Sequence, residues 1–201
     1  MQDNQLHKIL IVGGGAGGLE LATKLGNSLG KKKKAEITLI DAKKTHIWKP
    51  LLHEIAAGSI NPHKDELDYL AQGFWHGFKF RLGRMDNLDR EKKEVSLEPY
   101  LDNQGKEIIA RRTFKYDTLV MSIGSTVNDF SVNGAAEFSI ALDNQNQAEL
   151  FHNRLHNAIV KAQTQNFKIQ PGQLEVVIVG AGATGVELAA ELHKATREMT
   201  A

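Results

Sequence analysis

The chain has 201 residues, a length typical of one or two domains. Hydrophobic residues make up 41% of it and charged residues 24%, so it carries enough apolar material for a core and is not disordered as a whole. The formal net charge is +1, which gives no general electrostatic case for nucleic acid as a partner. There is no cysteine, which excludes disulfides, cysteine-ligated metal sites and thiol catalysis from these residues.

The sequence shows no sign of a membrane span or a leader. No stretch reaches the roughly 18 consecutive apolar residues of a transmembrane helix. The first apolar run, Ile9–Val12, is too short for the core of a signal peptide. These residues are therefore expected to be soluble and cytoplasmic, and the absence of cysteine agrees with a reducing compartment.

Apolar periodicity and turn residues predict the order of the elements. In chain order we expect a strand at 8–12, a helix at 16–29, a loop at 31–34, a strand at 36–40, a short helix at 49–58, a helix at 65–72, antiparallel strands at 78–88 and 94–98, a strand at 116–122, a helix at 145–163, a break at 171–172, and a strand at 175–179 followed by a helix.

The glycine motif Gly13-x-Gly15-x-x-Gly18 stands between the first predicted strand and the first predicted helix. Its first glycine permits a tight turn, its second lets the backbone approach a pyrophosphate, and its third lets the helix pack on the strand. Asp41 closes the next predicted strand, where a carboxylate can accept hydrogen bonds from the ribose hydroxyls of an adenosine. This context favours a dinucleotide site over a plain glycine turn in which Asp41 is only a cap.

A second motif, Gly180-x-Gly182-x-x-Gly185, repeats the same pattern of strand, glycine turn and helix, and its helix carries Glu187. The acidic residue of such a unit is expected about 20 residues after the third glycine, beyond Ala201. We therefore expect the chain to hold only the first part of a second nucleotide-binding unit. The alternative is a small protein that ends naturally on a helix.

Two dinucleotide units separated by an insertion suggest a flavin enzyme that also binds a nicotinamide nucleotide. The segment Thr45–Ser59 (THIWKPLLHEIAAGS) resembles the region after the second strand of type II NADH dehydrogenases, and most closely their proteobacterial branch. These are single-subunit NADH:quinone oxidoreductases that do not pump protons. Tyr116–Ser125 resembles their flavin-side strand, with Ser122-Ile123 in place of the usual pair, and Thr126–Phe130 also matches. The resemblance covers nearly all of this chain but only about the first half of a full-length family member.

The resemblance implies an α/β fold with two nucleotide-binding parts. Residues 1–170 would form a Rossmann-like FAD-binding domain, incomplete, with an antiparallel β insertion. Residues 171–201 would form the first βα unit of a truncated NADH-binding domain.

The same resemblance assigns roles to individual residues. For FAD it implies pyrophosphate contacts at Gly13, Gly15, Ala16, Gly17 and Gly18, a ribose contact at Asp41, flavin contacts at Lys49, Pro50 and Leu51, an adenine contact at Met85, and closure over the cofactor by Ser122, Gly124 and Ser125. For NADH it implies pyrophosphate contacts at Gly180, Gly182, Ala183, Thr184 and Gly185. Glu187 would lie near the contact between nicotinamide and flavin, as the candidate catalytic residue.

The implied activity is transfer of a hydride from NADH to the flavin of FAD, and of the electrons onward to a membrane quinone. The implied partners are NADH and a quinone, with no nucleic acid and no metal. Membrane contact is expected only through a C-terminal half that follows these residues. The full-length protein would be a homodimer, peripheral on the cytoplasmic face of the inner membrane.

Two other interpretations stay open. One is a different FAD and NAD(P)H oxidoreductase of the same architecture, such as a ferredoxin-reductase-like enzyme. The other is a nucleotide-binding fragment without activity of its own. The lack of cysteine argues against disulfide reductases and sulfide:quinone oxidoreductases, which use cysteine pairs.

Four further features have a plain interpretation and a functional one. Glu187 is either a catalytic carboxylate or a solvated one. The run Lys31–Lys34 is expected to be a solvated loop rather than a contact for anionic lipid. The pair His152 and His156 has the spacing of metal ligands but no evident third ligand, so a solvated helix face is expected. The aromatic residues of the stretch 74–80 are expected to pack in the core rather than form an exposed patch; they are Phe74, Trp75, Phe78 and Phe80.

Overall fold

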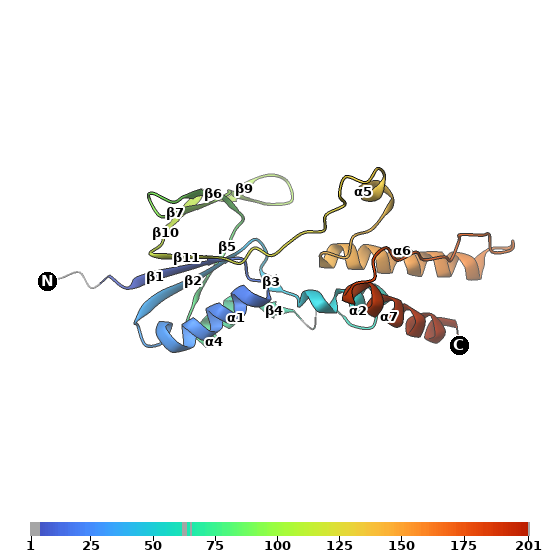
Figure 1. Ribbon diagram of the computed structural model, residues 1–201, viewed down its shortest axis with the longest axis horizontal. Helices are drawn as coiled ribbons and strands as arrows, with labels where there is room; N and C mark the ends of the chain where they lie inside the picture. Colours follow the sequence, from blue (N-terminus) through green and yellow to red (C-terminus); the bar gives the residue numbers. More distant parts are fainter. Residues whose placement is uncertain (1–4, 62–63, 65, 201) are drawn as a thin grey trace. The chain divides into compact units, whose positions relative to one another are not determined.

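The computed structural model describes residues 5–61, 64 and 66–200. The chain divides into two compact units, and each of them is assembled from separate stretches of sequence (Figure 1). Unit 1 comprises Met1–His46 and Glu66–Ser125, and unit 2 comprises Ile47–Asp65 and Thr126–Ala201. The two units are described one after the other.

Unit 1 is built on a four-stranded parallel sheet in the order β11-β1-β2-β5. The strands are β1 (His7–Val12), β2 (Ala35–Asp41), β5 (Lys79–Leu82) and β11 (Thr118–Met121). The central strands β1 and β2 are rich in Ile, Leu and Val because a parallel sheet is buried on both faces. This arrangement confirms the predicted Rossmann-like α/β fold.

One face of this sheet is covered by helices. Helix α1 (Ala16–Leu25) continues into a single π turn (Gly26–Gly30), and α4 (Tyr69–His76) precedes β5. Their apolar side chains pack with every second residue of the inner strands in a core that includes Ile11, Leu19, Ala22, Ile37, Leu39, Tyr69, Phe78 and Phe80. Helix α4 corresponds to the helix predicted at 65–72 but begins later, at Tyr69. It follows the short antiparallel pairing of β3 (Thr45–His46) with β4 (Leu67–Asp68).

The other face of the parallel sheet is covered by a three-stranded antiparallel sheet in the order β10-β7-β6. Its strands are β6 (Met85–Asp89), β7 (Glu94–Leu97) and β10 (Arg112–Lys115), and a further hairpin joins β8 (Tyr100–Leu101) to β9 (Glu107–Ile109). Val95 and Leu97 pack on Leu10, Val12 and Ile40. These strand residues alternate with those of the first core and therefore lie on the opposite face of the parallel sheet. This is the predicted antiparallel insertion.

The single strand predicted at 78–88 is wrong in detail, because the stretch forms two strands in different sheets. β5 joins the parallel sheet beside β2, while β6 pairs antiparallel with β7. The chain changes direction at Gly83, whose backbone φ of +156° is a conformation that residues other than glycine rarely adopt. The alternation of Phe78, Phe80 and Leu82 stops at Gly83, where the chain leaves one sheet for the other.

Unit 2 is helical. Its elements are a 3-10 turn (Lys49–Leu51), α2 (Leu52–Ala57), α5 (Ala135–Phe138), α6 (Gln145–Thr164) and α7 (Ala183–Thr200). Helix α2 ends at Gly58, which adopts the left-handed conformation, as the sequence predicts. Buried residues of α2, α6 and α7 form one core; they include Leu52, Ile55, Ala56, Ala148, Leu155, Leu188 and Leu192.

The strand predicted at 175–179 does not form, although the helix that follows it does. Val177 and Val179 are 84% and 91% exposed, and the described part of the chain places no strand beside them. A strand needs a hydrogen-bonded neighbour to satisfy its backbone, and β-branched residues alone do not supply one.

Candidate functional site

The first glycine turn lies in unit 1 between β1 and α1. Gly13 has a φ of +101°, and a Cβ atom there would lie 2.2 Å from the carbonyl oxygen of Ser122. A Cβ atom on Gly18 would lie 1.8 Å from the carbonyl oxygen of Gly13, so the helix packs directly on the turn. At Gly15, by contrast, a Cβ atom would meet no atom within 4 Å. The turn thus has a first glycine in a conformation that favours glycine, an open second one and a tightly packed third one.

The second glycine turn, in unit 2, has the same three properties. Gly180 has a φ of +110°, and a Cβ atom on Gly185 would lie 2.2 Å from its carbonyl oxygen. A Cβ atom on Gly182 would again meet nothing within 4 Å. The turn therefore forms locally, without support from a paired strand.

Both turns lead into the N-terminus of a helix. α1 begins at Ala16, next to Gly17, and α7 begins at Ala183, next to Thr184. Neither helix has an acidic residue in its first turn, so the positive end of each helix dipole is not offset there. The open side of each turn therefore offers an anion a backbone without side chains and first-turn N–H groups. The residues present fit the pyrophosphate group of a dinucleotide.

Asp41 ends β2 beside the first turn. Its Oδ2 accepts a hydrogen bond of 2.7 Å from the backbone N–H of Gly14, and its Oδ1 accepts one of 2.8 Å from that of Lys43. Each carboxylate oxygen has two lone pairs, so both can also accept a hydrogen bond from a ribose hydroxyl. The geometry is therefore compatible with the predicted ribose contact.

Tyr69 is a residue of this site that the sequence did not reveal. It lies on α4, is almost fully buried, stacks on Phe80 at 4.9 Å between ring centroids, and donates a hydrogen bond of 2.7 Å to the carbonyl oxygen of Gly14. Burial raises the pKa of Tyr69 well above its ordinary value, and the negative charge of Asp41 adds to this, so the hydroxyl stays protonated and able to donate. Gly14, an additional glycine between Gly13 and Gly15, was the signal that could have indicated a close neighbour.

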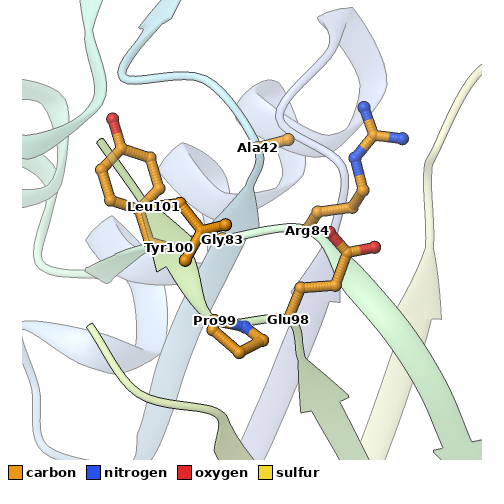
Figure 2. Close-up of a pocket in the computed structure, with 7 residues that line it drawn as sticks. All are labelled: Ala42, Gly83, Arg84, Glu98, Pro99, Tyr100 and Leu101. Carbon is orange, nitrogen blue, oxygen red and sulfur yellow. The ribbon is translucent and has the colours of Figure 1, made fainter. Parts of the chain in front are cut away.

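A pocket with a volume of about 190 Å³ opens beyond the end of β2 (Figure 2). The backbone N–H of Gly83 donates to the carbonyl oxygen of Asp41 at 2.8 Å, which places this pocket next to the predicted ribose contact. It is lined by Ala42, Gly83, Arg84, Glu98, Pro99, Tyr100 and Leu101. In Figure 2 the ring of Tyr100 and the side chain of Arg84 stand on its two sides. Met85, the predicted adenine contact, directly follows Arg84.

The predicted closing residues follow β11, which runs parallel to β1. The backbone N–H of Ser122 donates to Val12 at 2.7 Å, and its Oγ would lie 3.5 Å from a Cβ atom on Gly17. Ser122 therefore borders the first turn. Gly124, with a φ of +73° and open space around it, and Ser125 follow directly in the chain.

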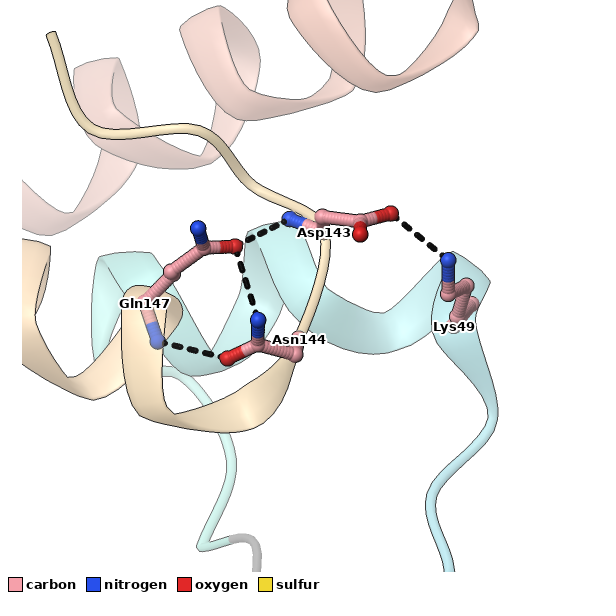
Figure 3. Close-up of polar contacts among 4 residues, drawn as sticks. All are labelled: Lys49, Asp143, Asn144 and Gln147. Atoms are coloured by element: carbon pink, nitrogen blue, oxygen red, sulfur yellow. Dashed lines mark hydrogen bonds and ion pairs between the residues drawn. The ribbon is translucent and has the colours of Figure 1, made fainter. Parts of the chain in front are cut away.

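The residues predicted to contact the flavin, Lys49, Pro50 and Leu51, lie in unit 2, in the 3-10 turn before α2. Figure 3 shows Lys49 with its polar contacts. The Nζ of Lys49 forms an ion pair of 2.7 Å with Asp143, which is held in turn by the start of α6. There the side chain of Asn144 accepts from the backbone N–H of Gln147 as the helix cap, and the Gln147 side chain accepts from the backbone N–H of Asp143. The ion pair fixes the lysine side chain on one side of the turn.

Glu187 lies in the second turn of α7 and faces α2 within unit 2. Its carboxylate is 3.5 Å from Nδ1 of His53, a side chain that is 12% exposed, while Glu187 itself is about half exposed. One turn further along, Glu191 accepts a hydrogen bond of 2.7 Å from the hydroxyl of Ser59. The structure thus packs the helix of the second glycine motif on α2, the helix that follows the turn Lys49–Leu51.

The predicted site residues therefore form two groups. Unit 1 holds the first glycine turn, Asp41, Met85 and the residues after β11, and unit 2 holds the turn Lys49–Leu51, the second glycine turn and Glu187. In the described part of the chain, no three His, Asp or Glu side chains gather in a way that could hold a metal ion. Among the described helices, none combines the length and the apolar character needed to cross a bilayer.

Comparisons with known proteins agree with this geometry. The type II NADH:quinone oxidoreductase of Haemophilus influenzae is 42% identical over 97% of this chain and 47% of its own length. The enzyme of the same name from Staphylococcus haemolyticus is 28% identical over 96% of this chain and 44% of its length. The chain thus spans about half the length of these curated relatives.

The fold also matches solved structures. NDH2 from Plasmodium falciparum in complex with NADH superposes with a TM-score of 0.79 at 21% identity, over 98% of this chain and 38% of that one. Residues 7–201 match the family model described as pyridine nucleotide-disulphide oxidoreductase, although this chain has no cysteine for disulfide chemistry. From this match and the paired glycine turns, we conclude that the chain belongs to the pyridine nucleotide-disulphide oxidoreductase family.

Proposed function

We propose that this chain is the nucleotide-binding part of an FAD-dependent NADH:quinone oxidoreductase of type II. The observation that carries the proposal is a pair of glycine turns with the same geometry at Gly13–Gly18 and Gly180–Gly185: a first glycine with positive φ, an open second one and a packed third one. Two turns of this kind suit two dinucleotides, and a reaction between two bound dinucleotides suits hydride transfer. The names of the Haemophilus influenzae and Staphylococcus haemolyticus relatives support the choice of acceptor.

The first turn is assigned to FAD. Gly15 leaves room for the pyrophosphate, and Ala16, Gly17 and Gly18 present their N–H groups from the start of α1. Asp41 accepts from the ribose hydroxyls, and the pocket beside Met85 receives the adenine. Lys49, Pro50 and Leu51 contact the flavin end, and Ser122, Gly124 and Ser125 close over the cofactor.

The second turn is assigned to NADH. Gly182, Ala183, Thr184 and Gly185 face its pyrophosphate at the start of α7. When bound, FAD supplies a ring that accepts a hydride from NADH and gives up two electrons to a quinone. Glu187 contributes a carboxylate near the nicotinamide, and it lies 3.5 Å from Nδ1 of His53 on α2.

Three finer features belong to the same proposal. The boundary between the FAD and the NADH domains falls near residue 170. The complete protein is a homodimer, and it binds the cytoplasmic face of a membrane through a C-terminal half. The resemblance of Thr45–Ser59 and Tyr116–Ser125 to the type II enzymes supports these assignments.

The test begins with the visible absorption spectrum of the purified chain before and after addition of FAD. A bound-flavin band is expected, and it should be absent in Gly15→Val, whose side chain fills the open position of the first turn. Turnover is then measured with NADH and a soluble quinone on a protein that carries the C-terminal half present in the relatives.

The acceptor separates the proposal from its nearest rival. Quinone reduction that far exceeds reduction of ferredoxin supports a type II enzyme, and the reverse contradicts it. A protein with both halves that binds no FAD would contradict the whole assignment.

A further inference from the structure

Two features outside the nucleotide sites meet at one edge of unit 1. The first is the lysine run Lys31–Lys34, whose four residues are exposed and directly follow the π turn after α1. The second is the C-terminal end of α4, where Phe74 and Trp75 are 86% and 59% exposed. Core packing of these two aromatic residues is therefore a wrong prediction, while Phe78 and Phe80 are buried as expected.

The two features are held together by close backbone contacts. A Cβ atom on Gly26 would lie 2.4 Å from the carbonyl oxygen of His76, and one on Gly30 would lie 2.1 Å from that of Gly77. A Cβ atom on Gly77 would in turn lie 2.7 Å from Cγ of Lys31. The lysine run therefore starts where α4 ends.

The solvent face of α4 is unusually apolar. Its inner face is buried through Tyr69 and Gly73, yet Leu70, Phe74 and Trp75 lie exposed around the rest of the helix. A helix on the surface of a protein in water normally carries polar residues there, whereas apolar residues on all sides are typical of burial or of contact with lipid. Trp, Phe and Leu are also the residues that enter the headgroup region of a bilayer.

The charged residues beside this face indicate that its binding partner is negatively charged. The nearest acidic side chain along the chain, Glu36, already forms an ion pair of 2.7 Å with Lys79. Lys24, in the last turn of α1, adds a further exposed positive charge. Four adjacent lysines reach the lower size of the basic clusters that bind anionic lipids.

We propose that Lys31–Lys34 together with Leu70, Phe74 and Trp75 form a docking surface for a membrane of anionic phospholipid. The lysines lie against the headgroup phosphates, and the aromatic side chains enter the boundary between headgroups and acyl chains. This contact is additional to the C-terminal one that the resemblance implies, and it does not depend on the proposed redox function.

The test uses the 201-residue chain with Trp48→Phe, so that Trp75 is the only tryptophan. The chain is mixed with vesicles of phosphatidylglycerol and phosphatidylethanolamine, or of phosphatidylcholine alone. We expect co-sedimentation with the anionic vesicles only, weakened by salt. Trp75 emission should move to shorter wavelength and be quenched by brominated lipid.

Two variants test the two parts of the surface. Changing all four residues of Lys31–Lys34 to Gln should weaken vesicle binding by about tenfold or more. Phe74→Ser with Trp75→Ser should weaken it similarly at high salt. The matched control removes the same charge elsewhere in unit 1, with Gln at Lys92, Lys93, Lys106 and Lys115, and should leave the binding within about twofold.

Three results would overturn the proposal. One is no binding to anionic vesicles at low salt, and another is binding during which Trp75 emission does not change. The third is binding to double-stranded DNA as strong as binding to lipid, which would show a general attraction to polyanions. Far-ultraviolet circular dichroism confirms that each variant is folded, and all exchanged side chains are on the surface.

Discussion

The hydroxyl of Tyr69 and the carbonyl oxygen of Gly14 are joined by a hydrogen bond of 2.7 Å, and both residues are buried. The N–H of the same glycine donates to Asp41 at 2.7 Å. Gly14 is thus held at its N–H and at its carbonyl group by two different elements, α4 and β2. The shape of the turn that is to receive a pyrophosphate depends on both.

Tyr69→Phe is expected to lower the free energy of unfolding by about 1–3 kcal/mol, because the buried Gly14 carbonyl loses its partner. FAD affinity should fall as well, since the turn is less well fixed. Urea unfolding and flavin titration measure the two effects. Tyr116→Phe, at a partly buried tyrosine of the other core, is the control. A variant with unchanged stability and affinity would show that the hydrogen bond does not position the turn.

Neighbouring glycines should respond in opposite ways. In Gly14→Ala the new methyl would lie 2.5 Å from the Tyr69 hydroxyl oxygen, and overpacking of this kind costs about 1–3 kcal/mol. Gly15→Ala meets no neighbour and changes only the cap of α1, so less than about 1 kcal/mol is expected. Yet Gly15→Ala should weaken FAD binding more, because its methyl points into the phosphate space. Thermal unfolding and flavin titration of both variants check this reversal of order.

Glu187→Gln should slow flavin reduction by NADH by about tenfold, which corresponds to about 1.4 kcal/mol of activation free energy. FAD content should stay unchanged, because Glu187 lies on the helix that follows the second glycine turn, which is assigned to NADH. Stopped-flow absorbance of the flavin follows the reaction in a protein with both halves. Glu191→Gln, one turn further along α7, is the matched control. Equal rates for the wild type and Glu187→Gln would make Glu187 a solvated carboxylate only.

The stability of unit 1 should decrease in mild acid because of His46. Burial lowers the pKa of His46 below its ordinary 6.5, and the nearby charge of Asp41 opposes this only in part. The unfolded chain therefore binds a proton at higher pH than the folded one, so the contribution of His46 is complete above pH 6.5 and is lost as the pH falls through its lowered pKa. Urea unfolding across this range should have a smaller pH slope in His46→Gln. Identical slopes would contradict the prediction.

The parts of the fold that depend on local patterns could be predicted from the sequence. The strand, glycine turn and helix at 8–25 follow from β-branched residues, three spaced glycines and a helical apolar face. Gly58 ends α2 as expected because its left-handed conformation favours glycine. These features are encoded within a few residues of one another.

The failures concern partners that are distant in sequence. Gly83 interrupts the apolar alternation of 78–88, but the two partner strands, β2 and β7, lie elsewhere in the sequence, so the stretch was predicted as one strand. The run 175–179 has the composition of a strand, but pairing depends on a neighbour. Phe74 and Trp75 look like core residues until the register of α4 is known, and the register depends on Tyr69 filling the space under Gly14.

Within the site, the glycine motifs and Asp41 could be predicted because their spacing and their positions next to strands are visible in the sequence. Tyr69 could not be found because its partner is 55 residues away in the sequence. The contact between His53 and Glu187 was equally hidden, since α2 and α7 are brought together by apolar residues that bear no motif. The cofactor roles of these residues stay predictions.

The division of the chain into interleaved stretches has a consequence during its synthesis. Unit 1 is complete once Ser125 has been made, whereas α2 belongs to unit 2 and packs on α6 and α7. Protein synthesis adds about 5–20 residues per second, so the roughly 90 residues between α2 and α6 are made on the order of 5–20 s after α2. During this time the apolar side chains of Leu52 and Ile55 have no partner helix on which to pack.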